Sequence, residues 1–384
     1  MLAAGTACTQ TNPEPGGGAQ GGAEDTVVVG FPGDFTGDWA YYDLPMKEGA
    51  QFAIDQINAN GGLDGKEFVL ETIDTRGDTT ETAKATQELL DKGAVYLIGT
   101  TSEGINAQGA VACDAGVPVS TGDGTAATLT SDIGECAFQL IMNDTIQGGT
   151  IAEYAVEQDY ESAYVLSSPV IPYTKNLPGY FTEVFEDGGG SVVGTDQFKL
   201  AAGDYSAAVT KIANASPQPD VIFTPMFPPD TQVFMRQLRQ AGVDIPVLST
   251  DGNLDNSLLD AGKEALDGFV FTAAVCPPGT DDEGVSSFFE DYNAEYDADP
   301  SSVVAVLGYD EVQILAQAIE DAGASDAESI MASLAEVAHE GISGAIEMDP
   351  ETRRVRKPAA LVKMDGDAFS CLAQPSYPAL VPEP

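Results

Sequence analysis

Two loops of small and polar residues hold the side chains best suited to bind a small molecule. The apolar run Val95–Ile98 breaks into GTTSEG, and the run Val117–Val119 breaks into STGDGT. A buried strand that ends in such a loop ahead of a helix presents unpaired backbone N–H groups at the carboxyl edge of a sheet, where α/β proteins bind ligands. The loops are one strand–helix unit apart, so we expect them to form one pocket wall through Ser102, Glu103, Asp123, Gly124 and Thr125.

Aromatic residues and one acid follow other predicted strands. The aromatic residues are Trp39, Tyr41, Tyr42, Tyr173 and Phe227. Such side chains can line a cleft, although core packing is the commoner role and stays open for each of them. Asp251 directly follows an apolar run, in LSTDGN, where its carboxylate could hold an ammonium group. The alternative role for Asp251 is an Asx turn or the N-cap of a helix over 254–261.

The sequence contains no P-loop, no GxSxG and no HExxH motif. Its single histidine, His339, excludes a multi-histidine metal site and is expected on the surface near a helix end. The stretch Gly122–Ala127 fits the loose nucleotide pattern GxGxxA, but the helix after it would be short and no acidic partner for a ribose follows. A carboxylate pair for glycosidase chemistry stays open, although no local motif marks one. We therefore expect no enzyme, no cofactor and no metal.

The charge of the chain limits its partners. The 384 residues include 61 acidic and 16 basic residues, which gives a net charge of −45. Nucleic acid is excluded as a partner because binding to its backbone needs clustered Lys and Arg, and anionic lipid surfaces would repel the chain. The acids are spread along the sequence, which is typical of the solvated shell of a secreted or salt-adapted protein. No apolar run is long enough for a transmembrane helix.

Strands and helices alternate along the chain, which predicts a doubly wound α/β architecture. The length exceeds the usual limit of a single core, and two successive β/α halves without a sequence repeat predict two similar lobes. Strands are expected at 26–30, 67–74, 95–98, 117–119, 162–166, 191–198, 220–224, 246–248, 268–273, 345–348 and 359–364. Helices are expected at 45–60, 79–92, 104–115, 146–158, 174–186, 205–214, 230–241, 284–296, 302–322 and 327–338.

The N-terminal segment looks like a processed anchor. Cys8 ends the stretch MLAAGTAC, and residues 9–25 are rich in Gly and Pro, which is typical of a flexible tether. The stretch resembles the end of a bacterial lipoprotein signal peptide, in which a lipidated cysteine becomes the mature N-terminus. Ala7 fits that pattern, whereas Gly5 stands where Leu is usual. The alternative is a free cysteine at a frayed chain end.

If Cys8 is the anchor, four of the five cysteines remain. Cys113 and Cys136 flank the second ligand loop, which suggests a local disulfide, and Cys276 and Cys371 are then left to pair over a long separation. Disulfides imply an oxidising compartment.

A longer pattern resembles a known family. The segments KEGAQFAIDQINANGGLDGK, DAGVPVSTGDGTAATLT and PDVIFTPMFPPDTQVFMRQLRQAGVDIPVLSTDG follow one another as in periplasmic binding proteins of the leucine/isoleucine/valine type, which serve ABC importers. The resemblance runs from Thr26 to Asp367. It implies the type I fold, in which two Rossmann-like lobes with parallel-rich sheets are joined by three crossovers and hold the ligand in their cleft. We expect crossovers near Asn143, Ala274 and Asp349, so that lobe 1 comprises 26–143 and 275–348 and lobe 2 comprises 144–274 and 349–384.

The resemblance also implies roles for individual residues. The implied ligand contacts are an aromatic residue of the first loop (Tyr42), a Ser that holds an amino-acid carboxylate (Ser102, beside Glu103), backbone and hydroxyl contacts (Asp123, Thr125), aromatic walls of lobe 2 (Tyr173, Phe227) and an acid for the α-ammonium group (Asp251). The pair Cys113 and Cys136 resembles a disulfide found in many relatives.

Two positions depart from the family pattern. Glu103 and Asp123 stand where Ser and Ala are more usual, and carboxylates there would repel a ligand carboxylate. Either these side chains turn away, or the ligand is not a plain branched-chain amino acid. A polar or cationic amino acid, or an amide, would suit an acidic pocket, and Trp39 would add a cation–π face.

The resemblance implies an extracytoplasmic, monomeric component of an ABC importer, and the separate N-terminal pattern implies a lipid anchor through Cys8. The component would bind an amino acid or a related small polar or amide metabolite by hinge closure and then dock on a membrane permease. One alternative is a receptor domain that senses a small amide or amino acid for a signalling partner. A nucleotide-dependent α/β enzyme is the other.

Overall fold

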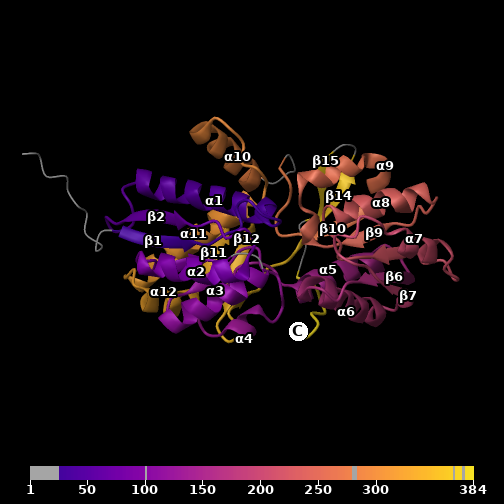
Figure 1. The fold of residues 1–384 in the computed structure, drawn as a ribbon, viewed down its shortest axis with the longest axis horizontal. Coiled ribbons are helices and arrows are strands. Elements are labelled where there is room, and N and C mark those ends of the chain that lie inside the picture. The colour runs from indigo at the N-terminus through magenta and orange to yellow at the C-terminus, as the bar shows by residue number, and fades with distance from the viewer. Residues whose placement is uncertain (1–25, 100–101, 279–282, 366–367, 374–376) are drawn as a thin grey trace, which may run out of the picture.

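The computed structural model describes residues 26–99, 102–278, 283–365, 368–373 and 377–384. Two lobes lie side by side along the long axis of the molecule (Figure 1), and each consists of one sheet with helices on its faces. The α/β fold with two parallel-rich lobes is therefore confirmed. The predictions for Cys8 and for the tether of residues 9–25 fall outside the described part of the chain.

The sheet of lobe 1 has eight strands among the described residues, in the order β11-β12-β13-β5-β4-β3-β1-β2. Its β1 to β5 are parallel, and the hairpin β11–β12 adds an antiparallel edge. The short strands β3 and β4 are buried at every residue, as expected for parallel strands that helices cover on both faces. The strands are β1 (Thr26–Phe31), β2 (Glu67–Thr72), β3 (Tyr96–Ile98), β4 (Val119–Thr121), β5 (Ala137–Gln139), β11 (Ala338–Gly341), β12 (Gly344–Asp349) and β13 (Arg354–Val355). The helices are α1 (Ala40–Ala59), α2 (Thr79–Asp91), α3 (Ser102–Ala115), α4 (Leu129–Ile133), α10 (Glu283–Tyr296), α11 (Ala305–Ala322) and α12 (Ala327–Leu334).

The sheet of lobe 2 has seven described strands, in the order β15-β14-β10-β9-β8-β6-β7. The strands from β6 to β10 are parallel, and β14 and β15 close one edge as antiparallel strands. The strands are β6 (Ser162–Ser167), β7 (Ser191–Gln197), β8 (Val221–Phe223), β9 (Val247–Ser249), β10 (Phe269–Ala273), β14 (Ala360–Asp365) and β15 (Ala368–Ala373). The helices are α5 (Asp144–Glu157), α6 (Pro172–Asp187), α7 (Ser206–Ala213), α8 (Asp230–Gln240) and α9 (Lys263–Leu266), with the 3-10 turns η1 (Asp251–Asn253) and η2 (Asn256–Ala261).

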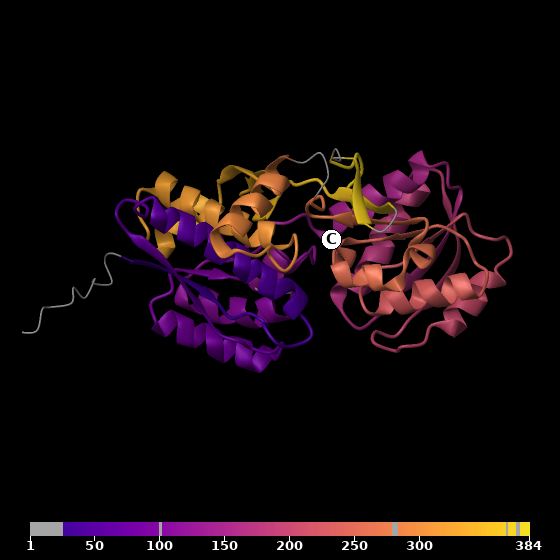
Figure 2. The ribbon, with the colours of Figure 1, turned by 90° about the horizontal axis from the view of Figure 1, so that it is seen from above.

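The chain passes between the two sheets three times: after β5, after β10 and after β13. In the view from above (Figure 2), the yellow C-terminal part of the chain spans the junction of the lobes. The prediction placed the third passage near Asp349, and in the structure the chain leaves lobe 1 slightly later, after Val355. The reason is that β13 pairs with β12 and with β5, which keeps residues 354–355 in the sheet of lobe 1.

Helix α1 begins earlier than predicted. Trp39 is its N-cap, and Pro45, which was expected near the helix start, lies inside the helix. Tyr41 and Tyr42 therefore lie in the first helical turn and not in a loop. A proline this close to the N-terminus removes only one backbone hydrogen bond, which the helix tolerates because it packs along α11.

The contact between α1 and α11 requires glycine on both helices. A Cβ atom at Gly49 would lie 1.7 Å from the carbonyl oxygen of Ala305, and one at Gly308 would lie 2.0 Å from that of Met46. Neither distance is possible for a larger residue without a shift of the helices. This close approach fixes the position of α1 and of the side chains at its N-terminal end.

Two other predicted helices differ in the structure. The helix after Ala327 ends at Leu334, and β11 follows, so His339 lies in a strand opposite Ile346 and not near a helix end. Gly344, with φ of 106°, allows the tight turn that pairs β11 with β12. The helix expected over 254–261 is the 3-10 turn η2.

Both predicted disulfides are present. Cys113–Cys136 joins the end of α3 to the residue before β5, with Cα atoms 5.3 Å apart. Cys276–Cys371 joins the second passage between the lobes to β15, with Cα atoms 5.6 Å apart. No helix in the described part of the chain has the length and apolar character needed to span a membrane.

Candidate ligand pocket between the lobes

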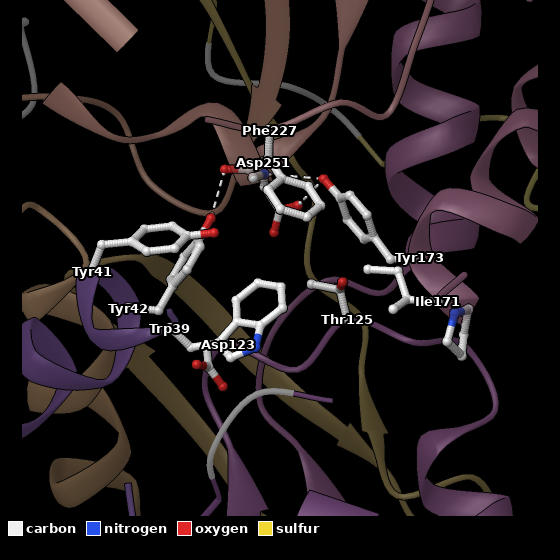
Figure 3. Close-up of a pocket in the computed structure, with 11 residues that line it drawn as sticks. Trp39, Tyr41, Tyr42, Asp123, Thr125, Ile171, Tyr173, Phe227 and Asp251 are labelled. Atoms are coloured by element: carbon white, nitrogen blue, oxygen red, sulfur yellow. Dashed lines mark hydrogen bonds between the residues drawn. The ribbon is translucent and has the colours of Figure 1, made fainter. Parts of the chain in front are cut away.

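A pocket with about 530 Å³ of empty volume, part of it open to solvent, lies between the lobes (Figure 3). Its walls come from segments that follow the carboxyl ends of β1, β4, β6, β8 and β9. The lining residues are Trp39, Tyr41, Tyr42, Asp123, Thr125, Ile171, Pro172, Tyr173, Phe227, Asp251 and Gly252. The structure thus brings most of the predicted ligand residues together. Predictions for the side chains of Ser102 and Glu103 fall outside what the structure describes.

Asp251 forms the centre of the lobe 2 wall. Its backbone N–H donates to Gln147 Oε1 at 3.1 Å, and its Oδ1 accepts from the Tyr173 hydroxyl at 3.0 Å. The η1 turn has no side-chain cap, whereas Asp255 caps η2 by accepting from the backbone N–H of Ser257. The capping role considered for Asp251 therefore belongs to Asp255. The Asp251 carboxyl group points into the pocket (Figure 3), although the residue is only 7% exposed.

Tyr173 is held in place by the backbone around Asp251. Its hydroxyl lies 2.6 Å from Thr250 Oγ1 and accepts from the Gly252 N–H at 3.0 Å. The ring of Tyr173 lies edge-on to Phe227, with centroids 6.3 Å apart. Because Tyr173 is bonded at both Thr250 and Asp251, it positions the acid as well as forming a wall of its own.

Asp123 lies on the opposite wall, in the loop after β4. Thr121 Oγ1 accepts from the Gly124 N–H at 2.7 Å and lies 2.9 Å from Asp123 Oδ1. Gln139 Nε2 donates to the Gly124 carbonyl oxygen at 2.7 Å. These bonds hold Gly124 behind the wall, and only its neighbours Asp123 and Thr125 reach the pocket.

Two acids that sequence reasoning missed shape the loop after β1. Asp34 accepts from the backbone N–H groups of Gly37 at 2.6 Å and Trp39 at 3.0 Å. Asp43 Oδ2 in turn accepts from the Asp34 N–H at 2.6 Å. Both acids are buried, and together they fix the position of Trp39 at the pocket. No local pattern marks them, because the bonds depend on how the loop folds over the start of α1.

The lobes contact each other across the pocket. The Tyr42 hydroxyl of lobe 1 donates to the backbone oxygen of Asp251 in lobe 2 at 2.9 Å. The ring centroids of Trp39 and Phe227, also from opposite lobes, lie 5.7 Å apart. A ligand in the pocket would therefore be surrounded by both lobes.

The pocket is electrostatically unusual because its acids are buried. Burial raises the pKa of Asp251 to about 6. Burial also raises the pKa of Asp123 to about 6, and the negative charge of Asp251 adds to that effect. None of the described lining residues is Lys, Arg or His. Among the described residues, no group of three or more His, Cys, Asp or Glu side chains could hold a metal ion.

The pocket also contains residues that were not predicted as ligand contacts. Ile171, Pro172 and Gly252 each lie within two positions of Tyr173 or Asp251 in the sequence, so proximity was the available signal, whereas Tyr41 had been named only as an aromatic residue that could line a cleft. Tyr41 stacks against Trp39, with ring centroids 6.1 Å apart, because α1 begins before it.

Two α/β lobes that enclose a pocket at the carboxyl ends of their strands define a solute-binding protein of the hinged type. The chain belongs to the periplasmic binding protein family, whose model matches residues 26–368. Membership of this family implies a location outside the cytoplasm.

Curated relatives and solved structures agree with this placement. The chain is 26% identical to the Leu/Ile/Val-binding protein BraC3 of Rhizobium johnstonii, over 81% of this chain and 84% of that one. Its fold matches that of the branched-chain amino acid transporter substrate binding protein LivJ from Streptococcus pneumoniae in complex with isoleucine, with a TM-score of 0.81, 27% identity and coverage of 90% and 99%. The leucine binding protein LivK of Thermotoga maritima matches with a TM-score of 0.80, 26% identity and coverage of 90% and 98%.

Proposed function

We propose that the chain is the solute-binding component of an ABC importer and captures an amino acid or a related small polar or amide metabolite between its lobes. The observation that carries the proposal is the pocket itself, with Asp251 on one lobe and Asp123 and Thr125 on the other. The relatives named as binding proteins and transporter components support the transport role.

Binding is coupled to hinge closure in this proposal. A ligand that touches both walls has more contacts when the lobes are close, so it shifts the population toward the closed state. The Tyr42–Asp251 hydrogen bond and the contact between Trp39 and Phe227 are the protein's own contributions to closure. The closed shape then docks on a permease.

The remaining parts of the proposal follow from charge and chemistry. The chain acts as a monomeric binding protein without catalysis, and its net charge of −45 disfavours nucleic acid as a partner. Cys8 is the proposed site of a lipid anchor, which would keep the protein beside its permease.

A ligand screen tests the proposal. Differential scanning fluorimetry of the full chain against amino acids, amides and amines should find a compound that raises the melting temperature, and titration calorimetry should then give its dissociation constant. Asp251→Ala should weaken that compound's binding at least about tenfold, because a hydrogen bond to a charged group contributes about 1.5–3 kcal/mol. The ligand-free variant should not melt below the wild type, since Asp251 caps no helix.

Asp255→Ala is the matched control. It removes the cap of η2 and should lower the melting temperature by the equivalent of about 1 kcal/mol while leaving the dissociation constant unchanged. The proposed pocket function would be refuted if the screen found no stabilising compound, or if the ligand bound to the Asp251→Ala variant as tightly as to the wild type.

A further inference from the structure

The pocket carries negative charge on both walls. Asp123 lies on lobe 1 and Asp251 on lobe 2, and the described lining residues include no basic side chain. Two further buried acids lie behind the walls. They are Asp144 and Glu311: burial raises the pKa of each well above its ordinary value, and the charges of Asp251 and Asp123 respectively raise it further, so these two acids stay protonated. A ligand that enters the pocket therefore meets acids from both sides.

Asp123 has no basic partner in the described part of the protein. Thr121 Oγ1 lies 2.9 Å from Asp123 Oδ1, and Asp43, which is another acid, forms a side-chain hydrogen bond with Asp123. Two carboxyl groups hydrogen-bonded to each other share a proton, which leaves the pair with one negative charge. A cation in the pocket would balance that charge.

Aromatic side chains surround these acids. They are Trp39, Tyr41 and Tyr42 at the start of α1, Tyr173 in α6 and Phe227 after β8. Figure 3 shows the rings arranged around a common space, with Asp251 above it and Asp123 below. The faces of aromatic rings attract cations, and several rings together form cages for organic ammonium groups. Ring faces hold an organic cation better than a hydrated metal ion, which prefers oxygen ligands.

We propose that the ligand is an organic ammonium ion with a net positive charge, held between Asp123 and Asp251 and enclosed by the aromatic side chains. This inference rests on the proposed function and narrows its ligand class. A neutral zwitterion would bring a carboxylate along with its ammonium group, and that carboxylate would lie near an acid on one wall or the other. An ammonium ion with no offsetting carboxylate, or with a second cationic group, suits both walls.

Two kinds of ammonium group share this chemistry, and two probes separate them. A primary ammonium donates hydrogen bonds to the carboxylates, whereas a quaternary ammonium cannot and depends on the ring faces. The primary probe is 1,4-diaminobutane and the quaternary probe is choline. L-leucine serves as the zwitterion and benzoate as the anion.

The measurement is titration calorimetry of the full chain at pH 8 in 1 M KCl. At this ionic strength the Debye length is about 3 Å, so the net charge of −45 no longer attracts cations non-specifically. One ammonium probe should bind at least about tenfold more tightly than L-leucine and benzoate, a difference of about 1.4 kcal/mol or more.

Asp123→Asn keeps the shape of the side chain and removes its charge. It should weaken binding of the preferred ammonium probe at least about tenfold while binding of L-leucine stays unchanged or improves. The matched control is Asp132→Asn, which changes the net charge equally at an exposed position of α4 and should leave every affinity unchanged. Asp251→Asn gives an independent test from lobe 2 if the Asp123 variant does not fold.

Several results would overturn the inference. The first is tighter binding of L-leucine or benzoate than of both ammonium probes. The second is no binding of either ammonium probe. The third is an affinity for the ammonium probe that stays unchanged in both Asp→Asn variants of the pocket. The first result would leave the proposed function standing with a different ligand class. Failure of the proposed function is a separate result, in which no compound of the wider screen binds.

Discussion

The charge on Asp251 destabilises the ligand-free protein. Its pKa is raised to about 6 by burial, whereas the ordinary value of an aspartate is 3.8. The folded state therefore keeps a proton that the unfolded chain has already released between these two pH values. Below pH 3.8 both states are protonated and the penalty is absent. It grows as the pH rises and reaches its full size, roughly 3 kcal/mol, above pH 6.

Asp251→Asn should remove this pH dependence. We expect the ligand-free variant to melt at a higher temperature than the wild type at pH 8, because no charge has to be buried, and at nearly the same temperature at pH 4. Differential scanning calorimetry from pH 4 to pH 8 measures the difference between the two proteins. Asp132→Asn is the control: because Asp132 is exposed, the melting temperature of this variant should differ from that of the wild type equally at pH 4 and pH 8. An equal difference at both pH values for Asp251→Asn would contradict the prediction.

At the scale of elements, the two disulfides hold different parts of the molecule. Cys113–Cys136 encloses the segment that carries β4, the Asp123 loop and α4, with a separation of 23 residues. Cys276–Cys371 connects the second passage between the lobes to the edge of the lobe 2 sheet, with a separation of 95 residues. The first therefore supports a pocket wall, and the second supports the connection between the lobes.

Removing each disulfide should have a distinct effect. In the chain-entropy model the shorter loop contributes about 3 kcal/mol and the longer one about 5 kcal/mol. We expect the double variant Cys276→Ser/Cys371→Ser to lower the free energy of unfolding more than the double variant Cys113→Ser/Cys136→Ser does. Ligand binding should be weakened more by Cys113→Ser/Cys136→Ser, because only the loss of that disulfide releases the Asp123 loop. Urea unfolding and calorimetric titration of both double variants measure the two effects. The reverse order in affinity would show that the loop does not depend on its disulfide.

At the scale of the whole molecule, the net charge of −45 is the dominant property. Like charges spread over one compact surface repel each other, and folding brings them closer together. The described ion pairs, such as Lys84–Glu81 and Lys211–Asp196, lie at the surface and offset little of this repulsion. Dissolved salt should therefore stabilise the folded state.

Raising KCl from 0.1 M to 1 M should increase the melting temperature of the ligand-free protein at pH 8. The reason is that the Debye length falls from about 10 Å to about 3 Å, which screens the repulsion between surface acids. The same experiment at pH 4 is the control, because many carboxylates are then protonated and the salt effect should shrink. A salt effect of equal size at both pH values would point to a cause other than charge.

Part of the pocket could be predicted because the residues of its walls come directly after apolar runs that mark strands in the sequence. Asp123 and Thr125 follow a short apolar run, as does Asp251, and parallel strands bring such loops to a common edge. The aromatic residues were named from the same rule. Asp34 and Asp43 could not be found this way, because their hydrogen bonds join a loop to the first turn of α1. Pro45 had led to the prediction that this helix begins later than it does.

The sequence by itself determined the alternation of strands and helices, the two-lobed α/β class and the acidic character, because hydrophobic periodicity and charge are local properties. Only the tertiary structure decided the rest. The two-residue strand β13 exists because it pairs with β5 and β12, and β11 exists because a turn folds it onto β12. Tyr42 meets Asp251 across 209 residues of sequence. Whether Asp123 finds a partner depends on which groups the fold brings to it, and no pattern along the chain contains that information.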